Sequence, residues 1–326
     1  MTNPGGPAAS TQTTTTTMVT SADGVALAVH AYTELDPQRA TILAIHGYPD
    51  NHHVWDRVAQ ELIDRYPGRY NIVAYDVRGA GSSSAPSHRS GYRFPHLIAD
   101  VAAVIEHLGR SGVDRVHLLG HDWGSIQGWA AVTDTDLANA IGSYTSISGP
   151  HLDYAGRFLR SARSLRTLGD VLRQLLESSY IWLFLTPRIP EAAFRSGLGV
   201  RVLGWLDRIG RSGAPQPGLP RGENDYVNGL NLYRANMPGP FVRPAKPLPM
   251  TDVAVQVLAP RLDLFVSPAL QRFTGSIPAH HRVVDIDGGH WVVTDRPGVI
   301  AQFTDEWVQR SVADGADPSG NDIRHA

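Results

Sequence analysis

The sequence predicts an α/β fold: a mostly parallel sheet with helices on both faces and an inserted helical cap. Three observations support this prediction. Short apolar runs alternate with helical patterns through residues 25–147, the alternation stops at Gly149-Pro150, and it resumes only at Val253. Strands that alternate with helices at this spacing are typical of a parallel sheet. With 326 residues, the chain is also long enough to bury an ordinary core.

The first half of the chain contains most of the predicted strands. Residues 25–32 alternate like a half-exposed strand, and residues 41–45 form a continuous apolar run like a buried strand. In residues 54–66, apolar side chains recur on one face of a predicted helix. The remaining predictions here are strands at 72–75, 116–119 and 144–147 and helices at 96–108 and 125–132.

In the second half, the alternation resumes after a long helical region. We predict a strand at 253–258, a helix at 268–273, a strand at 282–286 and a helix at 297–312. The core is therefore expected to comprise residues 18–149 and 250–312, with residues 150–249 as the cap. Residues 238–249 contain five prolines, which end helices, so they are expected to form a loop, and residues 213–222 are expected to be a mobile cap loop.

Both ends of the chain are poor in apolar residues. Residues 1–17, which include TQTTTTT, are predicted to be a disordered leader, and residues 313–326 a disordered tail. The leader lacks the apolar segment of a signal peptide, and no apolar run is long enough to span a bilayer. We therefore expect a cytoplasmic protein without an integral membrane segment. The absence of cysteine excludes disulfides, thiolate metal ligands and a cysteine nucleophile.

Charge is distributed unevenly along the chain. Residues 151–250 contain 14 Lys and Arg and 7 Asp and Glu, a net charge of +7, whereas the rest contains 15 and 24, a net charge of −9. This asymmetry marks the cap as a separate unit. The overall balance is acidic and no nucleic-acid motif is present, so nucleic acid is not an expected partner.

Four arginines recur every third residue near the start of the cap. Arg157, Arg160, Arg163 and Arg166 predict a helix with a basic flank. Such a flank is usually a solvated face. A second hypothesis is that it attracts anionic amphiphiles or a membrane surface.

The segment Gly120-His121-Asp122-Trp123-Gly124 follows a predicted strand and precedes a predicted helix. Small residues at this place permit the tight turn that lifts the central side chain above the sheet edge, the nucleophile elbow. The helix N-terminus also favours an ionised carboxylate. We therefore predict that Asp122 is the nucleophile.

An oxyanion hole is expected next to this turn. The loop after the strand at 41–45 supplies the backbone N–H of Tyr48, and Trp123 supplies the other. We expect substrate to contact His46 and Pro49 in the same loop, and Trp291.

Asp263 and His290 each lie in a loop after a later strand. The order of nucleophile, acid and base matches that of α/β hydrolases. Asp285 and Asp287 are alternatives to Asp263, which could instead cap the following helix.

An aspartate at the elbow restricts the chemistry. A serine that displaced a leaving group at a saturated carbon would form an ether, which an activated water does not cleave. A carboxylate forms an ester, and water deprotonated by His290 can attack its carbonyl carbon. The residues thus favour substrates attacked at saturated carbon: epoxides or alkyl halides.

Metal sites and cofactors are not expected. The pairs His52-His53 and His280-His281 place adjacent rings in different directions, and no ligand recurs at helical spacing.

The segments HGYPD, YDVRGAGSS, GHDWGS, LNLYRANM and GGHW resemble those of epoxide hydrolases with the α/β-hydrolase fold, across nearly all of residues 20–312. The resemblance implies two cap tyrosines that hold the epoxide oxygen. Tyr233 and Tyr180 match them, with Tyr154 and Tyr226 as competing residues. The chain also resembles the hydrolase half of actinobacterial proteins that join such a domain to a short-chain dehydrogenase.

The resemblance implies an epoxide hydrolase that needs no cofactor and acts on a small, lipophilic epoxide, as a monomer or homodimer. A haloalkane dehalogenase is the nearest alternative, since those enzymes share the HDWGS segment. Their usual Asn after His-Gly is Tyr48 here, which favours the epoxide. A ligand-binding protein of the same fold without catalysis is the third reading.

Overall fold

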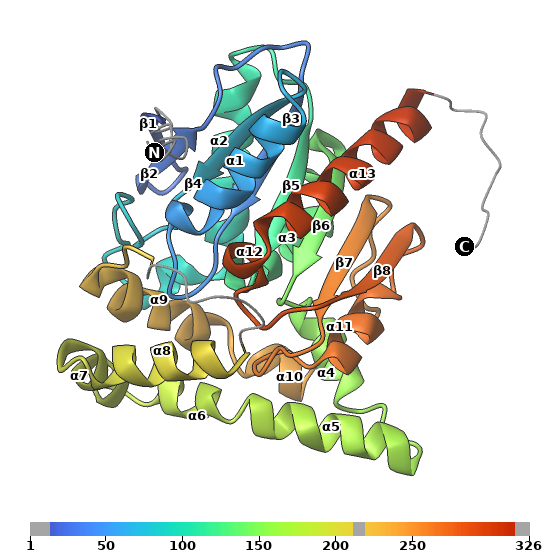
Figure 1. Cartoon of the computed structure of the whole chain (residues 1–326). Coiled ribbons are helices and arrows are strands. Elements are labelled where there is room, and N and C mark those ends of the chain that lie inside the picture. The colour runs from blue at the N-terminus through green and yellow to red at the C-terminus, as the bar shows by residue number, and fades with distance from the viewer. Residues whose placement is uncertain (1–13, 211–218, 317–326) are drawn as a thin grey trace, which may run out of the picture.

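The architecture was determined from a computed structural model, which describes residues 14–210 and 219–316 (Figure 1). An eight-stranded sheet runs through the described residues in the order β1-β2-β4-β3-β5-β6-β7-β8. β1 with β2, and β2 with β4, pair antiparallel, whereas all later neighbours are parallel. The strands are β1 (Thr15–Thr20), β2 (Ala26–Ala31), β3 (Ala40–Ile45), β4 (Tyr70–Tyr75), β5 (Val116–His121), β6 (Ile141–Ile147), β7 (Ala254–Pro260) and β8 (His281–Ile286).

Alternate residues of the central strands enter two different cores. In β3, Ile42 and Ala44 pack into one apolar cluster, whereas Leu43 and Ile45 pack into the other. The period of two along a strand explains this division, and it requires helices on both faces. One face is covered by α1 (Asp56–Arg65), α12 (Val292–Asp295) and α13 (Pro297–Ala316), and the other by α2 (Phe94–Gly109) and α3 (Trp123–Val132) (Figure 1). The predicted α/β fold is confirmed.

A helical insertion, residues 150–249, connects β6 to β7. It forms the lower layer of the molecule in Figure 1, beneath the carboxyl ends of the parallel strands. Its helices are α4 (Leu152–Phe158), α5 (Leu165–Glu177), α6 (Tyr180–Leu185), α7 (Ile189–Arg195), α8 (Leu198–Gly210), α9 (Glu223–Asn236) and α10 (Gly239–Val242). After β7, α11 (Pro268–Gly275) returns the chain to the sheet.

Two predictions within the insertion are wrong in detail. The basic segment 157–166 is not one helix, because α4 ends at Phe158 and the side chain of Ser164 caps the start of a new helix, α5. The proline-rich segment 238–249 contains α10, whose Pro240 occupies the first turn, where a missing N–H costs least. Of the predicted mobile loop 213–222, residues 213–218 lie outside the described residues.

The predicted leader and tail both extended too far into the fold. Residues 15–17 are not disordered, since they belong to β1, where Thr15 pairs with Ala31 and Thr17 with Val29. β-branched threonines suit a strand, although a polar run gives no apolar signal. At the other end, α13 continues through Ala316, beyond the predicted limit at residue 312. Residues 1–13 and 317–326 lie outside the described residues.

The helices within residues 14–210 and 219–316 are too short or too polar to cross a bilayer.

Candidate active site

Asp122 lies at the turn between β5 and α3. Its backbone adopts φ 52° and ψ −121°, an unusual conformation for a residue with a Cβ atom, and its side chain is buried. The backbone at the end of β3 comes so close to this turn that only glycine fits at position 124. A Cβ atom on Gly124 would overlap the carbonyl oxygen of Ile45. The geometry agrees with the predicted elbow.

The loop after β3 reaches this carboxylate. The backbone N–H of Tyr48 donates a hydrogen bond of 2.6 Å to Oδ1 of Asp122. A Cβ atom on the preceding Gly47 would overlap the same oxygen, so the approach depends on glycine there. One oxygen of the carboxylate is thereby held, while Oδ2 faces His290.

His290 lies between two carboxylates. Its Nε2 is 3.5 Å from Oδ2 of Asp122, and its Nδ1 donates to Asp263 at 3.1 Å and 3.2 Å from the two oxygens. Asp263 also accepts hydrogen bonds from the backbone N–H groups of Phe265 and Val266. Asp285 and Asp287, by contrast, pair with Arg272 and Arg261.

Burial and charge act on the His290 ring in opposite directions. Burial lowers its pKa, but the negative charge of Asp263 and the hydrogen bonds that the ring donates to both carboxylates outweigh this effect and raise the pKa to about 10. For Asp263, burial opposes ionisation, yet the charge of His290 and the hydrogen bonds it receives keep the pKa below its usual value. The arrangement stabilises a protonated ring between two ionised carboxylates.

Two tyrosines of the insertion lie near the carboxylate. Tyr180 begins α6 and Tyr233 lies on α9, with 6.1 Å between their ring centroids. Burial raises the pKa of both hydroxyls, and the negative charge of Asp122 contributes to each increase. The ring of Tyr233 also packs against that of Trp123, at 4.9 Å between centroids.

The competing tyrosines have other partners. Tyr154 donates its hydroxyl to the carbonyl oxygen of Pro249 at 2.5 Å and stacks on His151. Burial raises the pKa of the Tyr226 hydroxyl, and the neighbouring guanidinium of Arg221 partly offsets this increase. The structure thus brings Tyr180 and Tyr233 to Asp122.

The three predicted substrate contacts differ in their surroundings. Both ring nitrogens of His46 are engaged by backbone: Nε2 accepts from Val77 N–H at 2.8 Å, and Nδ1 donates to the Gly47 carbonyl. Pro49 is buried in the same loop. Trp291 packs against His290 at 4.9 Å between ring centroids and donates its indole N–H to Asp50. Because both ring nitrogens of His46 are bonded to backbone, His46 supports the loop.

Several neighbours of the site were not foreseen. The centroid of the Phe265 ring lies 4.8 Å from that of His290 and 5.3 Å from that of Tyr180. Phe265 thus connects His290 with the insertion. His121 is fully buried and donates through Nε2 to the carbonyl oxygen of His290. Phe184, four residues after Tyr180 in the sequence, packs on Tyr233, but no local pattern identifies Phe265.

The indole nitrogen of Trp123 is a further polar group at this site. It is buried and has no hydrogen-bond partner among the described residues. A buried donor without a partner is costly, so this N–H is available to a bound group.

A separate polar cluster joins His30, His52 and Asp76, whose potential ligand atoms all lie within 4.8 Å of one another. The sequence did not predict this cluster, because His30 and Asp76 are far from His52 along the chain. The two rings stack 3.5 Å apart, and each donates to a different oxygen of Asp76. Hydrogen bonds therefore join the three side chains of this cluster.

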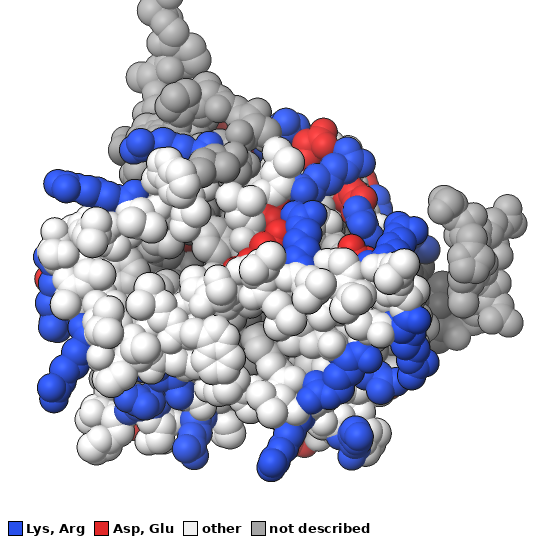
Figure 2. Space-filling view, turned by 90° about the horizontal axis from the view of Figure 1, so that it is seen from below, with Lys and Arg blue, Asp and Glu red and all other residues white. Residues whose placement is uncertain are grey.

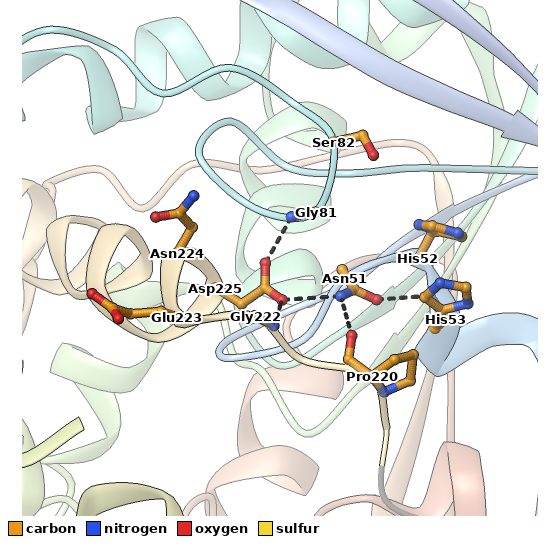
Figure 3. Close-up of a pocket in the computed structure, with 10 residues that line it drawn as sticks. All are labelled: Asn51, His52, His53, Gly81, Ser82, Pro220, Gly222, Glu223, Asn224 and Asp225. Carbon is orange, nitrogen blue, oxygen red and sulfur yellow. Dashed lines mark hydrogen bonds between the residues drawn. The ribbon is translucent and has the colours of Figure 1, made fainter. Parts of the chain in front are cut away.

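His52 also borders an open hollow of about 550 Å³ between the core and the insertion (Figure 3). Asp225 is one of the residues that line it, and its carboxylate accepts from Gly81 N–H at 2.7 Å and from the Asn51 amide at 3.0 Å. Its lining includes none of Asp122, Asp263 and His290, so this hollow is separate from the candidate active site.

Comparison with known proteins identifies the family. A model of the alpha/beta hydrolase fold matches residues 40–297. Epoxide hydrolase 4 of Mus musculus is 31% identical over 273 residues, which cover 79% of this chain and 70% of the relative. The chain belongs to the epoxide hydrolase family of α/β hydrolases. The predicted family is therefore confirmed.

Another relative in this family comparison is longer than the chain. The protein named probable oxidoreductase EphD from Mycobacterium tuberculosis is 32% identical over 312 residues, which cover 93% of this chain but 50% of the relative. The chain thus spans about half the length of that relative.

Solved structures of epoxide hydrolases share the fold. One from Bacillus megaterium has a TM-score of 0.70 at 21% identity and covers 90% of this chain and 100% of its own. One from Vigna radiata has a TM-score of 0.69 at 23% identity, and the match covers 93% of this chain and 100% of the Vigna radiata chain. At these identities the likeness concerns the fold alone.

Proposed function

We propose that the protein hydrolyses epoxides to vicinal diols through a covalent ester on Asp122. The observation that carries the proposal is that Asp122 contacts both Tyr48 N–H and His290, while its charge also acts on the hydroxyls of the two insertion tyrosines. The names of the relatives and the intact set of residues support it. Residues 150–249 act as the cap over this site.

In the first step, Oδ2 of Asp122 attacks an epoxide carbon. A carbon–oxygen bond forms as the epoxide C–O bond breaks, and Tyr180 or Tyr233 protonates the oxygen that is released. Tyr48 N–H holds Oδ1, so this atom stays the carbonyl oxygen of the ester. A phenol is suited to this role because it can protonate an alkoxide at neutral pH.

In the second step, His290 takes a proton from water, which attacks Cγ of Asp122. Negative charge develops on Oδ1, where the backbone N–H groups of Tyr48 and Trp123 stabilise it. The bond from Cγ to Oδ2 then breaks, and protonated His290 gives its proton to the diol oxygen. The proton of the new carboxylic acid passes to the neutral ring of His290, which restores the protonated resting state.

Loss of charge on Asp122 makes His290 a base at the right time. In the resting site two carboxylates hold the proton on the ring, which raises its pKa. Once Asp122 is an ester, one of these charges is gone and the pKa of His290 falls. The ring then gives its proton to the tyrosinate formed in the first step, and the neutral ring can accept a proton from water.

A single turnover in heavy-oxygen water tests the covalent step. With enzyme in excess over an aromatic epoxide, the first diol should carry an unlabelled new oxygen, because this atom comes from Oδ2. Label should appear instead in the peptide containing Asp122, measured by mass spectrometry after digestion. A fully labelled first diol with unlabelled Asp122 would mean that water attacks the epoxide directly.

Dehalogenation is the second candidate function, because the buried indole N–H of Trp123 has no partner among the described residues and could donate to a leaving halide. Two hydroxyls close to Asp122 favour the epoxide. A panel of epoxides run beside chloro- and bromoalkanes distinguishes the two: halide release without diol formation would establish the dehalogenase. If the protein turns over neither epoxides nor haloalkanes but still binds some of them tightly, it would instead be a ligand-binding protein.

A further inference from the structure

The outer face of α5, α6, α7 and α8 exposes large apolar side chains to solvent. We call this surface the outer cap face. Leu165 is 90% exposed, Leu176 76% and Trp182 64%. Other exposed members are Leu168, Leu172, Leu175, Leu183, Ile189, Leu198, Val200, Val202 and Trp205. Single exposed apolar residues are ordinary, but a set on adjacent helices marks a site of interaction.

The apolar residues of α5 form a stripe that points away from the protein. Leu165, Leu168, Leu172, Leu175 and Leu176 recur at spacings that place them along one side of the helix. A different side of the same helix carries the buried residues Val171 and Gln174. The helix therefore has one side for the protein and another apolar side for a partner.

α6, which begins with Tyr180 of the candidate active site, has the same two-sided character. Ile181 and Phe184 are buried, whereas Trp182 and Leu183 between them are exposed. Tyr180, at the start of this helix, faces Tyr233 and Phe265. One short helix thus connects the outer cap face with the site.

Arginines surround the apolar surface. Figure 2 views this face from below and shows a broad uncharged area with blue side chains along its margins. The exposed arginines of this region are Arg157, Arg160, Arg163, Arg166, Arg173, Arg188, Arg195, Arg201 and Arg208. Of the acidic residues here, Glu177 and Glu191 are partly buried and paired with Arg173 and Arg234, and Asp170 on α5 is also partly buried.

We propose that the outer cap face docks on the surface of an anionic lipid bilayer. Leucine and tryptophan side chains would enter the boundary between headgroups and acyl chains, while arginines contact lipid phosphates. Charge complementarity favours this partner, because basic groups surround an apolar area on a chain whose remainder is acidic. Docking does not depend on the proposed catalytic function and is tested without substrate.

Binding of the full chain to lipid vesicles, measured by cosedimentation, tests the proposal. Vesicles with 30% phosphatidylglycerol should bind the protein at least about tenfold more tightly than vesicles of phosphatidylcholine alone, and salt should weaken the binding. The variant Arg163→Gln/Arg166→Gln/Arg201→Gln should reduce the affinity about tenfold or more. The variant Leu172→Ser/Leu176→Ser/Trp182→Ser should reduce binding to both kinds of vesicle.

Matched control variants carry the same changes elsewhere. Arg89→Gln/Arg110→Gln/Arg115→Gln removes three exposed arginines of the core and should leave binding unchanged. Met18→Ser removes an apolar side chain that is 53% exposed on β1, with the same expectation. Because all of these positions are exposed, the variants should fold, which circular dichroism verifies.

Depth of insertion provides an independent readout. Brominated lipids should quench part of the tryptophan fluorescence, and Trp182→Phe/Trp205→Phe should remove that quenching. Equal binding of the outer-face and control variants would overturn the proposal. A stable dimer in light scattering that Leu172→Ser/Leu176→Ser/Trp182→Ser dissociates would also overturn it, since a second copy would then cover the face.

Discussion

At the residue scale, the proposed mechanism assigns protonation of the opened epoxide to the hydroxyls of Tyr180 and Tyr233. We expect Tyr180→Phe and Tyr233→Phe each to slow formation of the ester, and the double variant to slow it by about 10²–10⁴-fold, the usual contribution of a positioned acid. Rapid quench with enzyme in excess measures this step. Tyr154→Phe is the control, because its hydroxyl bonds to Pro249 instead. Normal ester formation in the double variant would reject the assignment.

The protonation of His290 gives a second prediction at this scale. Removing the Asp122 charge by Asp122→Ala should lower the pKa of His290 from its raised value of about 10, which NMR titration of the ring measures. Asp64→Asn, an exposed change on α1, should leave it unchanged. If the His290 pKa is the same in Asp122→Ala and the parent protein, the resting ion pair does not exist.

The same shift predicts how stability depends on pH. Because the folded-state pKa of His290 lies above its ordinary value of 6.5, the proton stabilises the fold fully below about pH 6.5. This contribution is lost as the pH rises toward 10. Thermal unfolding should therefore show a decline over this range that is smaller in Asp122→Ala, and an equal decline would contradict the prediction.

At the element scale, the turn between β5 and α3 depends on the absence of a side chain at Gly124. A Cβ atom there would meet the backbone of Ile45 and His46, which has little freedom to move within the sheet. We expect Gly124→Ala to cost about 1–3 kcal/mol of the free energy of unfolding and to abolish ester formation. Gly109→Ala, at the exposed end of α2 with nothing near its Cβ position, should be neutral or slightly stabilising. Equal melting temperatures for both variants would show that the turn tolerates a side chain.

Elements with their own local signal could be predicted from the sequence. β3 and β5 are buried strands with continuous apolar runs, so both could be located in the sequence. Tyr48 follows the first and Asp122 the second, and parallel strands bring these two loops to one edge of the sheet. β1 has no such signal, since its threonines become a strand only by pairing with β2. The break between α4 and α5 was missed because the arginine spacing continues across it, while Ser164 starts a new helix. Contacts such as Phe265 with His290 depend on how the insertion packs, which periodicity does not report.

At the scale of the whole molecule, one ion pair ties the helical insertion to the core. Asp50 follows β3 and is fully buried, and it accepts hydrogen bonds from Arg221 of the insertion and from the indole of Trp291 beside His290. The Arg221 guanidinium also lies over the Trp291 ring, 5.4 Å from its centroid. The contact thus connects three segments that are far apart in the sequence.

Breaking this pair should leave the Asp50 carboxylate buried with one donor fewer. We expect Arg221→Met to lower the free energy of unfolding by about 3–5 kcal/mol, as for other buried pairs that lose one partner. Arg110→Met, which breaks an exposed pair with Glu106, should cost less than about 1 kcal/mol. Urea unfolding of both variants measures the difference. Since Asp50→Asn removes the unpaired charge, adding it to Arg221→Met should restore part of the stability, and a double variant no more stable than Arg221→Met would show that the ion pair does not hold the insertion on the core.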